Sequence, residues 1–420
     1  MHTDHETMAE KKLIPIHAKI LSPAGPKFAV IRSRRDYPDV SGAYLDIAET
    51  FASPLLFGPP LCDELIALVL HMFTAEEAEI CRHIGIGTGK NASQLAALSH
   101  LPPETVAPAL QRLALEKRVI FSYAPGHGRA ADRKYRMLAL LPGVFELCMA
   151  RSAPDALTDW HCRFAALFEA LFATGYIAEY QTDKRIPFIR YVPVRQSIAA
   201  HPMALPSDKM EMILDRYKIF GVGICQCRTS EEIVGRGCGK PKQNCAVMGD
   251  FAAVGIRDGW LKKVSKKEML AIKLEAEREG LVNWTINIED ARSQGSCSCC
   301  ACCCQPFRMI AATNAPGIVA PPHFRPACHP DRCSGCGRCA AKCPVQAITV
   351  DKNAKTRQYA AERCIGCGLC AVACPRRALT MEVVPDYQPP YTNWLSMALD
   401  IGPGIVKNMW KIWKTRRSLF

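Results

Sequence analysis

Cysteine thiols are the residues of this chain best suited to chemistry, and they are concentrated in one part of it. Of 23 cysteines, 19 lie between Cys225 and Cys374, and the four earlier ones are Cys62, Cys81, Cys148 and Cys162. Several of the later ones are adjacent in sequence, and the N-terminal segment MHTDHETMAEKK lacks the apolar core of a signal peptide. This pattern is atypical of a secreted disulfide scaffold and indicates reduced, metal-binding thiols in the cytoplasm.

Two runs of four cysteines repeat the spacing C-x2-C-x2-C-x3-C-P, from Cys333 to Pro344 and from Cys364 to Pro375. A cubane iron–sulfur cluster needs thiolates at the corners of a tetrahedron, and one such loop can reach three corners while the fourth ligand comes from elsewhere. Glycines within each loop permit the tight turn. Zinc sites typically use paired knuckles of two cysteines, so the duplicated run indicates two [4Fe–4S] clusters.

These runs resemble the bacterial two-cluster [4Fe–4S] ferredoxin, and the resemblance covers residues 323–384. In that family the last cysteine of each run binds the other cluster. The resemblance implies one ligand set of Cys333, Cys336, Cys339 and Cys374, and a second set of Cys364, Cys367, Cys370 and Cys343. It also implies that Val345–Val350 and Ala378–Val383 are paired strands. Cys328 lies outside the pattern and is expected to be a spare thiol.

A second cysteine-rich module precedes the first, with ten cysteines between residues 225 and 304. They are Cys225, Cys227, Cys238, Cys245, Cys297, Cys299, Cys300, Cys302, Cys303 and Cys304. Between its two halves, Ser265 and Glu268 form a capping-box pattern and Gly280 provides a helix stop, so a folded α+β module is expected. The pattern resembles multi-domain 4Fe–4S-binding proteins of the anaerobe type, over most of residues 60–384, and implies no settled activity.

These ten thiols indicate one or two further iron–sulfur clusters, and a zinc site or a redox thiol store is the alternative. Cys225, Cys227, Cys238 and Cys245 could form one complete set. The run from Cys297 to Cys304 could supply another or complete the first. Adjacent cysteines cannot all point at one cubane, so some must be free or bind a second centre. Arg228 could donate to a cluster sulfur or simply face solvent.

The chain as a whole predicts an α+β multidomain protein. Residues 1–58 form a partly ordered arm with a β-type run at 27–32, and its His2, His5 and His17 lack metal-site spacing. Residues 60–150 read as three helices and a β-hairpin and resemble a winged-helix domain, with a capping box at Thr74 and Glu77. Residues 151–224 are a connecting α/β segment, with helices expected at 160–173 and 207–220. The cysteine-rich module (225–304), the ferredoxin domain (323–384) and a basic amphipathic tail (386–420) follow.

No signature of an organic-substrate enzyme is present. The segment IGIGTGKNAS (84–93) lacks the first glycine and the Ser/Thr of a phosphate loop, and it fails the dinucleotide fingerprint. Radical-SAM and haem-attachment cysteine patterns are absent as well. We therefore expect an electron carrier or redox subunit without independent catalytic activity.

The expected function is that of a multi-cluster ferredoxin that passes low-potential electrons to or from a partner oxidoreductase. A related alternative is an electron-input subunit of a larger redox enzyme. The other alternative is a redox-responsive DNA-binding regulator, because basic residues lie on the third helix and the hairpin of the winged-helix-like region: Arg112, Lys117, Arg118, Arg129, Arg133, Lys134 and Arg136. The net charge of +13 is partly counter-charge for clusters, so nucleic acid is not the expected partner.

The tail contains a short amphipathic helix predicted at Ile405–Arg417, set apart by Gly402-Pro403-Gly404. Apolar residues fall on one half of it and lysines on the other: Ile405, Val406, Met409, Trp410, Ile412 and Trp413 against Lys407, Lys411 and Lys414. No stretch is long and apolar enough to span a membrane. The helix is expected either to dock on protein or to contact the inner face of the membrane peripherally.

Overall fold

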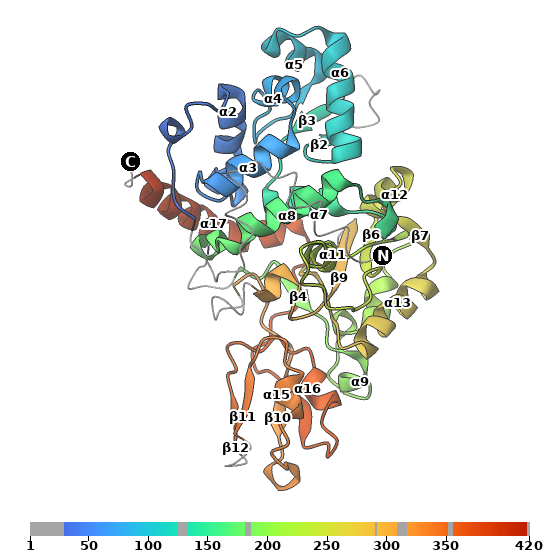
Figure 1. Cartoon of the computed structure of the whole chain (residues 1–420). Coiled ribbons are helices and arrows are strands. Elements are labelled where there is room, and N and C mark those ends of the chain that lie inside the picture. Colours follow the sequence, from blue (N-terminus) through green and yellow to red (C-terminus); the bar gives the residue numbers. More distant parts are fainter. Residues whose placement is uncertain are drawn as a thin grey trace, which may run out of the picture. The chain divides into compact units, whose positions relative to one another are not determined.

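The computed structural model describes residues 29–123, 133–180, 186–289, 292–308, 317–351 and 356–417 (Figure 1). The chain divides into two compact units. The N-terminal unit comprises residues 1–150, 157–180 and 408–420, and the cysteine-rich unit comprises residues 151–156 and 181–407. The cysteine-rich module (225–304) and the ferredoxin domain (323–384), which the sequence predicts as separate domains, thus lie in one compact unit. His2, His5 and His17 lie outside the described residues, and residues 29–32 form no strand, contrary to expectation.

The N-terminal unit is mainly helical. Its helices are α2 (Gly42–Phe51), α3 (Asp63–Met72), α4 (Ala75–Cys81), α5 (Ala92–Ser99), α6 (Pro103–Gln111), α7 (Phe145–Met149) and α8 (Asp159–Ala173). Three short strands, β1 (Lys90–Asn91), β2 (Phe121–Tyr123) and β3 (Lys134–Arg136), form an antiparallel sheet in the order β1-β3-β2. The predicted capping box opens α4, with Thr74 and Glu77 each satisfying the other's backbone N–H. The rings of Phe145 and Phe168 stack at 4.2 Å in the core.

Helix α6 contains Pro108 and continues into an irregular segment. Proline lacks the N–H of a regular helical turn, so the sequence predicts a kink in the first turns of this helix. In the structure α6 remains α-helical to Gln111, and the last turns, Arg112–Lys117, are π-helical. The helix then ends at Arg118, which adopts the left-handed conformation (φ 58°).

A six-stranded antiparallel sheet forms the centre of the cysteine-rich unit. Its strands run in the order β4-β8-β9-β6-β5-β7, with bounds Ile189–Tyr191, Val282–Ile286, Ser293–Cys299, Cys245–Gly249, Phe220–Gly223 and Lys262–Val264. The helices of this part are α9 (Arg195–Ile198), α10 (Met210–Leu214), α11 (Gln226–Ile233), α12 (Asp250–Arg257) and α13 (Lys266–Arg278). The helix predicted over 207–220 is wrong for most of its length, because only α10 and one 3-10 turn form and Phe220 already begins β5.

The two faces of this sheet differ in character, because successive side chains of a strand alternate between them. Phe220, Val222, Ala246 and Met248 pack with residues of α10 and α13. The predicted capping box of α13 forms between Ser265 and Glu268, and Gly280 follows the helix with φ 71°. Residues at the alternate positions, including Cys297 and Cys299 of β9, therefore lie on the face away from α13.

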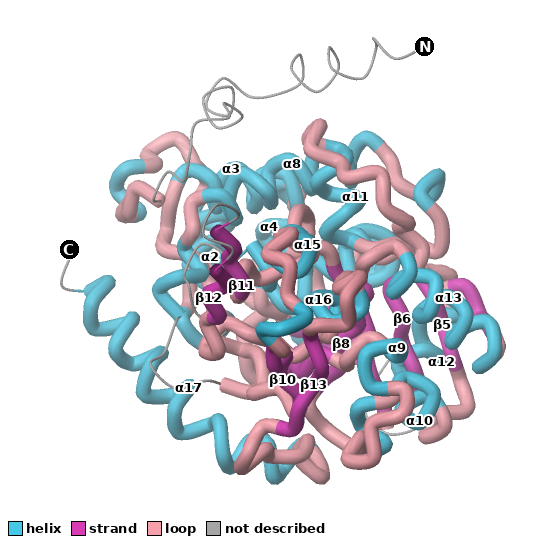
Figure 2. Tube along the Cα trace, turned by 90° about the horizontal axis from the view of Figure 1, so that it is seen from below, coloured by secondary structure: helices cyan, strands magenta, loops and turns pink. Residues whose placement is uncertain are grey.

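Two small antiparallel sheets follow in the C-terminal part of the unit. β10 (Phe324–Cys328) pairs with β13 (Leu379–Val383), and β11 (Ile348–Asp351) pairs with β12 (Thr356–Tyr359). The expected pairing of 345–350 with 378–383 is therefore wrong: each segment finds its partner in a strand that the cysteine pattern does not mark. Figure 2 shows β10 and β13 side by side, with the short helices α15 (Arg338–Ala341) and α16 (Leu369–Val372) nearby.

The chain ends in one long helix, α17 (Trp394–Arg417). The expected break at Gly402-Pro403-Gly404 does not occur, and the helix continues through Pro403 although that residue lacks the N–H for one intrahelical hydrogen bond. Within the cysteine-rich unit, Met397 and Ile401 of this helix pack on Ile288. Among the described residues, no helix has the length and hydropathy needed to cross a bilayer.

Candidate metal centres

The first cavity of interest is surrounded by thiols from both cysteine runs. It is lined by Cys333, Cys336 and Cys339 of the first run together with Cys374, the last cysteine of the second. Cys328, at the end of β10, is a fifth thiol in its wall. The fold thus brings together the four cysteines that the resemblance implies for one cluster, and it places the expected spare thiol beside them.

The second cavity has the reciprocal composition. Cys364, Cys367 and Cys370 of the second run line it together with Cys343, the last cysteine of the first run. Backbone N–H groups donate to thiols of both cavities, among them Ala347 to Cys343 at 3.2 Å, Ala378 to Cys374 at 3.2 Å and Gly366 to Cys364 at 3.4 Å. Such donors stabilise thiolate ligands, so the donor sets of both cavities fit a [4Fe–4S] cluster.

Glycine is required in the loops that carry these thiols. Gly335, Gly337, Gly366 and Gly368 all have φ between 68° and 76°, where side chains are disfavoured. A Cβ atom on Gly366 would also collide with Pro322 and the carbonyl oxygen of Phe324, and one on Gly368 would collide with Ser197. The second loop is therefore packed tightly against the segments around it.

The two cavities differ in their access to solvent. Cys364, Cys367 and Cys370 are each 8% exposed, whereas Cys336 is exposed and the other thiols of the first cavity are half-buried. The wall of the first cavity also contains four arginines, Arg332, Arg338, Arg357 and Arg376, and no acidic residue. The first cavity is thus an accessible, positively charged end of the domain, and the second is its interior end.

The ten cysteines of the upstream module separate into two groups in the structure. Cys238, Cys300, Cys302 and Cys303 form a compact group of four, with all Sγ atoms within 4.8 Å of one another. The other six interact in succession from Cys225 to Cys227, Cys304, Cys299, Cys297 and Cys245. We call these the four-thiol group and the six-thiol group. Each mixes cysteines from both halves of the module, unlike the set of Cys225, Cys227, Cys238 and Cys245 considered from the sequence.

Strand geometry explains how adjacent cysteines join different groups. Cys297 and Cys299 are two residues apart on β9 and share one face of the sheet. Cys300 follows the strand in a turn, and the amide of Cys304 donates to its carbonyl oxygen at 3.2 Å. Cys299 therefore belongs to the six-thiol group and Cys300 to the four-thiol group, and the same turn separates Cys303 from Cys304.

Two buried cations lie beside these thiols. The ammonium group of Lys273, fully buried on α13, donates to the carbonyl oxygens of Asn244 and Ser296 and to the Ser298 hydroxyl. Burial lowers the pKa of Lys273 to about 8, and the negative charge of the neighbouring Cys297 and Cys245 thiolates opposes this shift by raising the pKa. Arg228 is 3% exposed, and its Nη1 lies 3.8 Å from the Cys300 Sγ. Buried cations need counter-charge, and deprotonated thiols would supply it.

Buried polar atoms without partners also surround the six-thiol group. The hydroxyl of Tyr191 has no hydrogen-bond partner in the described structure, although Cys304, Cys299 and Cys297 are its electrostatic neighbours. Both amide atoms of Gln305, the residue after Cys304, are unpartnered too. Orphaned buried donors are costly, and a bound sulfide-containing group would satisfy them. This donor set fits an iron–sulfur centre at the six-thiol group.

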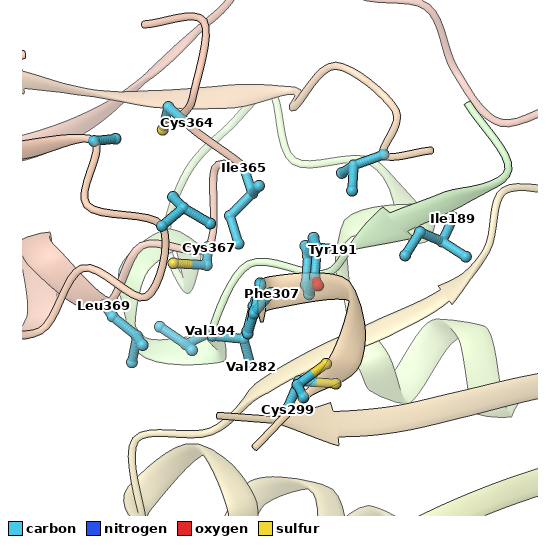
Figure 3. Close-up of a cluster of buried hydrophobic side chains, with 14 residues drawn as sticks. Ile189, Tyr191, Val194, Val282, Cys299, Phe307, Cys364, Ile365, Cys367 and Leu369 are labelled. Carbon is cyan, nitrogen blue, oxygen red and sulfur yellow. The ribbon is translucent and has the colours of Figure 1, made fainter. Parts of the chain in front are cut away.

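One buried core joins the six-thiol group to the second cavity. Cys299 and Cys304 belong to the same cluster of buried side chains as Cys364 and Cys367. Val194, Tyr191 and Phe307 lie between them in this cluster (Figure 3), and the rings of Tyr191 and Phe307 stack at 4.9 Å. Thiols of both modules therefore share a continuous, water-excluding interior.

Comparison with known proteins agrees with the C-terminal part of this picture. A family described as the 4Fe-4S dicluster domain matches residues 332–378, which identifies an iron–sulfur-binding domain in this part of the chain. Neither a curated protein nor a solved structure matches the chain.

Sequence reasoning named the thiols but missed the residues that organise them. Lys273 reads as one of several solvent-facing lysines of a charged helix, and Tyr191 reads as part of an ordinary β-rich stretch. The cross-strand register, in which Tyr191 pairs with Trp284 and Trp284 with Cys297, places Tyr191 near the thiols, and the packing of α13 on the sheet places Lys273 there. Arg228, for which two roles remained open, is buried beside Cys300.

Most cations considered for nucleic-acid binding have partners inside the N-terminal unit. Arg112 and Lys117 both bind the buried carboxylate of Glu77, at 2.9 and 2.6 Å. Arg118 donates to the carbonyl oxygen of Ala150 at 2.6 Å, and Arg133 donates to the Ser122 hydroxyl. Arg129 lies outside the described residues. The charges of the third helix thus serve the fold of the unit.

Proposed function

We propose that this protein transfers electrons between a redox partner and an iron–sulfur centre of its own cysteine-rich module. The observation that carries this proposal is the buried core shared by Cys367 of the dicluster domain and Cys299 and Cys304 of the six-thiol group. A core of this kind excludes water and fixes the relative positions of both thiol sets. The chemistry that bound [4Fe–4S] clusters would supply is one-electron transfer.

The ligand assignment follows the composition of the two cavities. Cys333, Cys336, Cys339 and Cys374 would hold the accessible cluster. Cys364, Cys367, Cys370 and Cys343 would hold the interior one. A third centre belongs in the six-thiol group, where Tyr191 and Gln305 offer unpartnered hydrogen-bonding groups and Lys273 offers positive charge.

The proposed partner is an acidic redox protein that approaches the first cavity. Cys336 is exposed there, and the surrounding arginines attract a negatively charged surface. Electrostatic steering of this kind raises association rates and weakens as salt is added. An electron-input subunit of a larger redox enzyme would use the same residues and differ only in the identity of this partner.

Residues 60–150 of the N-terminal unit are proposed to be a winged-helix-like domain that serves protein docking. Its α4, α5 and α6 are followed by a β-hairpin, and the sheet order β1-β3-β2 fits that fold. A DNA-binding regulator is disfavoured because Arg112, Lys117 and Arg118 are engaged in internal contacts. The proposed site of action is the cytoplasm.

Peripheral membrane contact is proposed for α17. The apolar face that is exposed for it contains fewer residues than the sequence predicts. Val406, Trp410 and Trp413 are 65%, 60% and 45% exposed, whereas Ile412 is buried and Ile405 and Met409 are half-buried. Leu395 and Leu399 are also exposed and continue the same stripe at helical spacing. Exposed tryptophans flanked by lysines are typical of a helix at a lipid interface.

Anaerobic redox titration of the full-length protein, followed by electron paramagnetic resonance, tests the central proposal. Three one-electron centres are expected, together with about twelve irons and twelve sulfides per chain, four of each for every cluster. Rapid-mixing reduction should show electrons reaching the third centre. Reduction of the dicluster domain with no electron arriving in the cysteine-rich module, in protein that contains all its iron, would refute it.

A further inference from the structure

The four-thiol group is more compact than any thiol set of the dicluster domain. The Sγ atoms of Cys238, Cys300, Cys302 and Cys303 all lie within 4.8 Å of one another, and those of Cys302 and Cys303 are 3.7 Å apart. Within the described ranges, no other trio of cysteine, histidine or carboxylate ligand atoms gathers so closely. The eight dicluster thiols instead surround open cavities.

This compactness distinguishes a single ion from a cluster. A tetrahedral zinc ion with Zn–S bonds of about 2.3 Å holds its sulfur atoms about 3.8 Å apart. In a [4Fe–4S] cluster each thiolate binds its own iron, so the four sulfurs must stand farther apart than they do around one ion. We propose that Cys238, Cys300, Cys302 and Cys303 form a mononuclear tetrathiolate site, and that its ion is zinc.

The fold builds this site from two segments that are distant in sequence. Cys238 lies in the loop between α11 and β6, and the other three follow the end of β9. Ala276 of α13 and Leu281 pack on Cys300, Cys303 and Cys238 in a small buried cluster. An ion at this point would fasten the loop to the turn that separates the two thiol groups, which is the role of a closed structural zinc site.

Charge also favours an ion at this position. Four thiolates around a divalent cation carry a net charge of −2, and compensation matters most on the side of Cys300 and Cys303, which are buried, whereas Cys302 is exposed. Arg228 supplies one positive charge there, because its guanidinium is buried and lies 3.8 Å from the Cys300 Sγ. Zinc is preferred to iron(II) because it binds N and S ligands more tightly in the order of divalent metals. The inference stands independently of electron transfer, and it leaves the six-thiol group as the module's iron–sulfur site.

Metal analysis of the anaerobically purified full-length protein tests the site. One zinc per chain is expected, and the zinc K-edge absorption spectrum should fit four sulfurs at about 2.3 Å. Cys238→Ala should lose at least nine-tenths of the zinc and keep its iron and sulfide. The control variant Cys148→Ala, which removes a buried cysteine of the N-terminal unit, should keep all three.

Four results would overturn the proposal. Loss of iron and sulfide together from Cys238→Ala would show a cluster in the four-thiol group. Unchanged metal content in that variant would show free thiols. Loss of one iron without sulfide would keep the mononuclear geometry and overturn the choice of zinc. If Cys238→Ala does not fold, the wild-type spectrum decides, since a zinc shell other than four sulfurs overturns the site. If the dicluster domain does not bind iron, the proposal of electron transfer is refuted, but the zinc result is unaffected.

Discussion

The backbone N–H of Val194 donates a hydrogen bond to the carbonyl oxygen of Cys367 at 2.9 Å. Val194 lies three residues after β4, and Cys367 lies in the second cysteine loop. Both side chains are buried in the core that also contains Cys299. This bond holds the interior end of the dicluster domain on the sheet that carries the six-thiol group. A fixed separation is what electron transfer between the two sites requires.

Crossed ligation of the two cavities predicts the effect of Cys374→Ala. Because Cys374 lines the cavity of Cys333, Cys336 and Cys339, its removal should damage the cluster of the first run. We expect the loss of about four irons per chain and of the more accessible centre in the redox titration. The matched variant Cys343→Ala should remove the interior centre instead. Interchanged losses in these two variants would contradict crossed ligation.

Tyr191→Phe tests whether the Tyr191 hydroxyl donates to a cluster in the six-thiol group. The substitution keeps the ring that stacks on Phe307 and removes only the unpartnered hydroxyl. Hydrogen bonds to cluster sulfur raise the reduction potential, so the potential of the third centre should fall by tens of millivolts while the iron content stays constant. Tyr217→Phe, in the core on the other face of the sheet, is the control. An unchanged third potential would place the Tyr191 hydroxyl outside the centre.

The charge of the accessible end predicts a salt-dependent encounter with an acidic redox protein. A variant with Arg332, Arg338 and Arg376 changed to Gln should associate at least tenfold more slowly at low salt, and should lose most of the salt dependence. Stopped-flow reduction at two ionic strengths measures both effects. The control triple variant Lys262, Lys263 and Lys266 to Gln alters exposed lysines near β7 and should react like the wild type. An equal loss of association rate and salt dependence in both variants would show that the effect comes from net charge and not from the arginines of the first cavity.

Glu77 predicts a pH-dependent contribution to the stability of the N-terminal unit. Burial alone would raise the pKa of Glu77, but hydrogen bonds from Lys117, the Thr74 amide and Arg112 hold it below its usual range. A carboxylate with a depressed pKa stabilises the fold above its unfolded pKa of about 4.3, and the stabilisation is lost as the pH falls through the folded value. Glu77→Gln should lower the free energy of unfolding of the N-terminal unit by about 3 kcal/mol at neutral pH. This is the lower end of the range for breaking a buried ion pair, because the Arg112 side chain is partly exposed to solvent.

Hydrogen exchange of peptides from α4 and α6 in the full-length protein measures this cost. The exchange of the wild type should accelerate as the pH is lowered towards 4, after correction for the intrinsic rate, and that of Glu77→Gln should already be fast at pH 7. Glu79→Gln removes a solvent-exposed partner of Arg82 and should change little. Equal protection of Glu77→Gln and wild type at pH 7 would refute the prediction.

Local signals made several elements and the dicluster domain predictable. The helix caps at Thr74 and Ser265 depend on residues three positions apart, and a cysteine run reports a loop that one short segment forms by itself. Pairings over long distances were not accessible in this way. β10 precedes the first run and pairs with β13 after the second, and nothing in the composition of Phe324–Cys328 marks it as that partner.

The grouping of the upstream thiols depends on the fold and could not be predicted from the cysteine spacing. From sequence, Cys238 could form one set with Cys225, Cys227 and Cys245. The strand register puts Cys245 beside Cys297, and the loop carries Cys238 to Cys303 instead. The Gly402-Pro403-Gly404 segment failed as a helix stop for a related reason. Residues before it pack on Ile288, and side chains after it such as Ile412 are buried, so tertiary contacts outweigh a weak local signal.

Trp410 and Trp413 predict how α17 meets a lipid surface. Both are exposed and lie on the stripe that includes Val406, and Lys414 lies 5.5 Å from the Trp410 ring. Insertion of the indole rings at the headgroup level, with lysines facing anionic lipid, would hold the protein at a membrane. Full-length protein should therefore float with vesicles that contain anionic lipid and sediment with neutral ones. The double variant Trp410→Ala and Trp413→Ala should lose at least nine-tenths of the floating fraction. Trp394→Ala, at the start of the helix and off this stripe, should float like the wild type. Flotation that is the same for the double variant and the wild type would show that this face of α17 does not contact lipid.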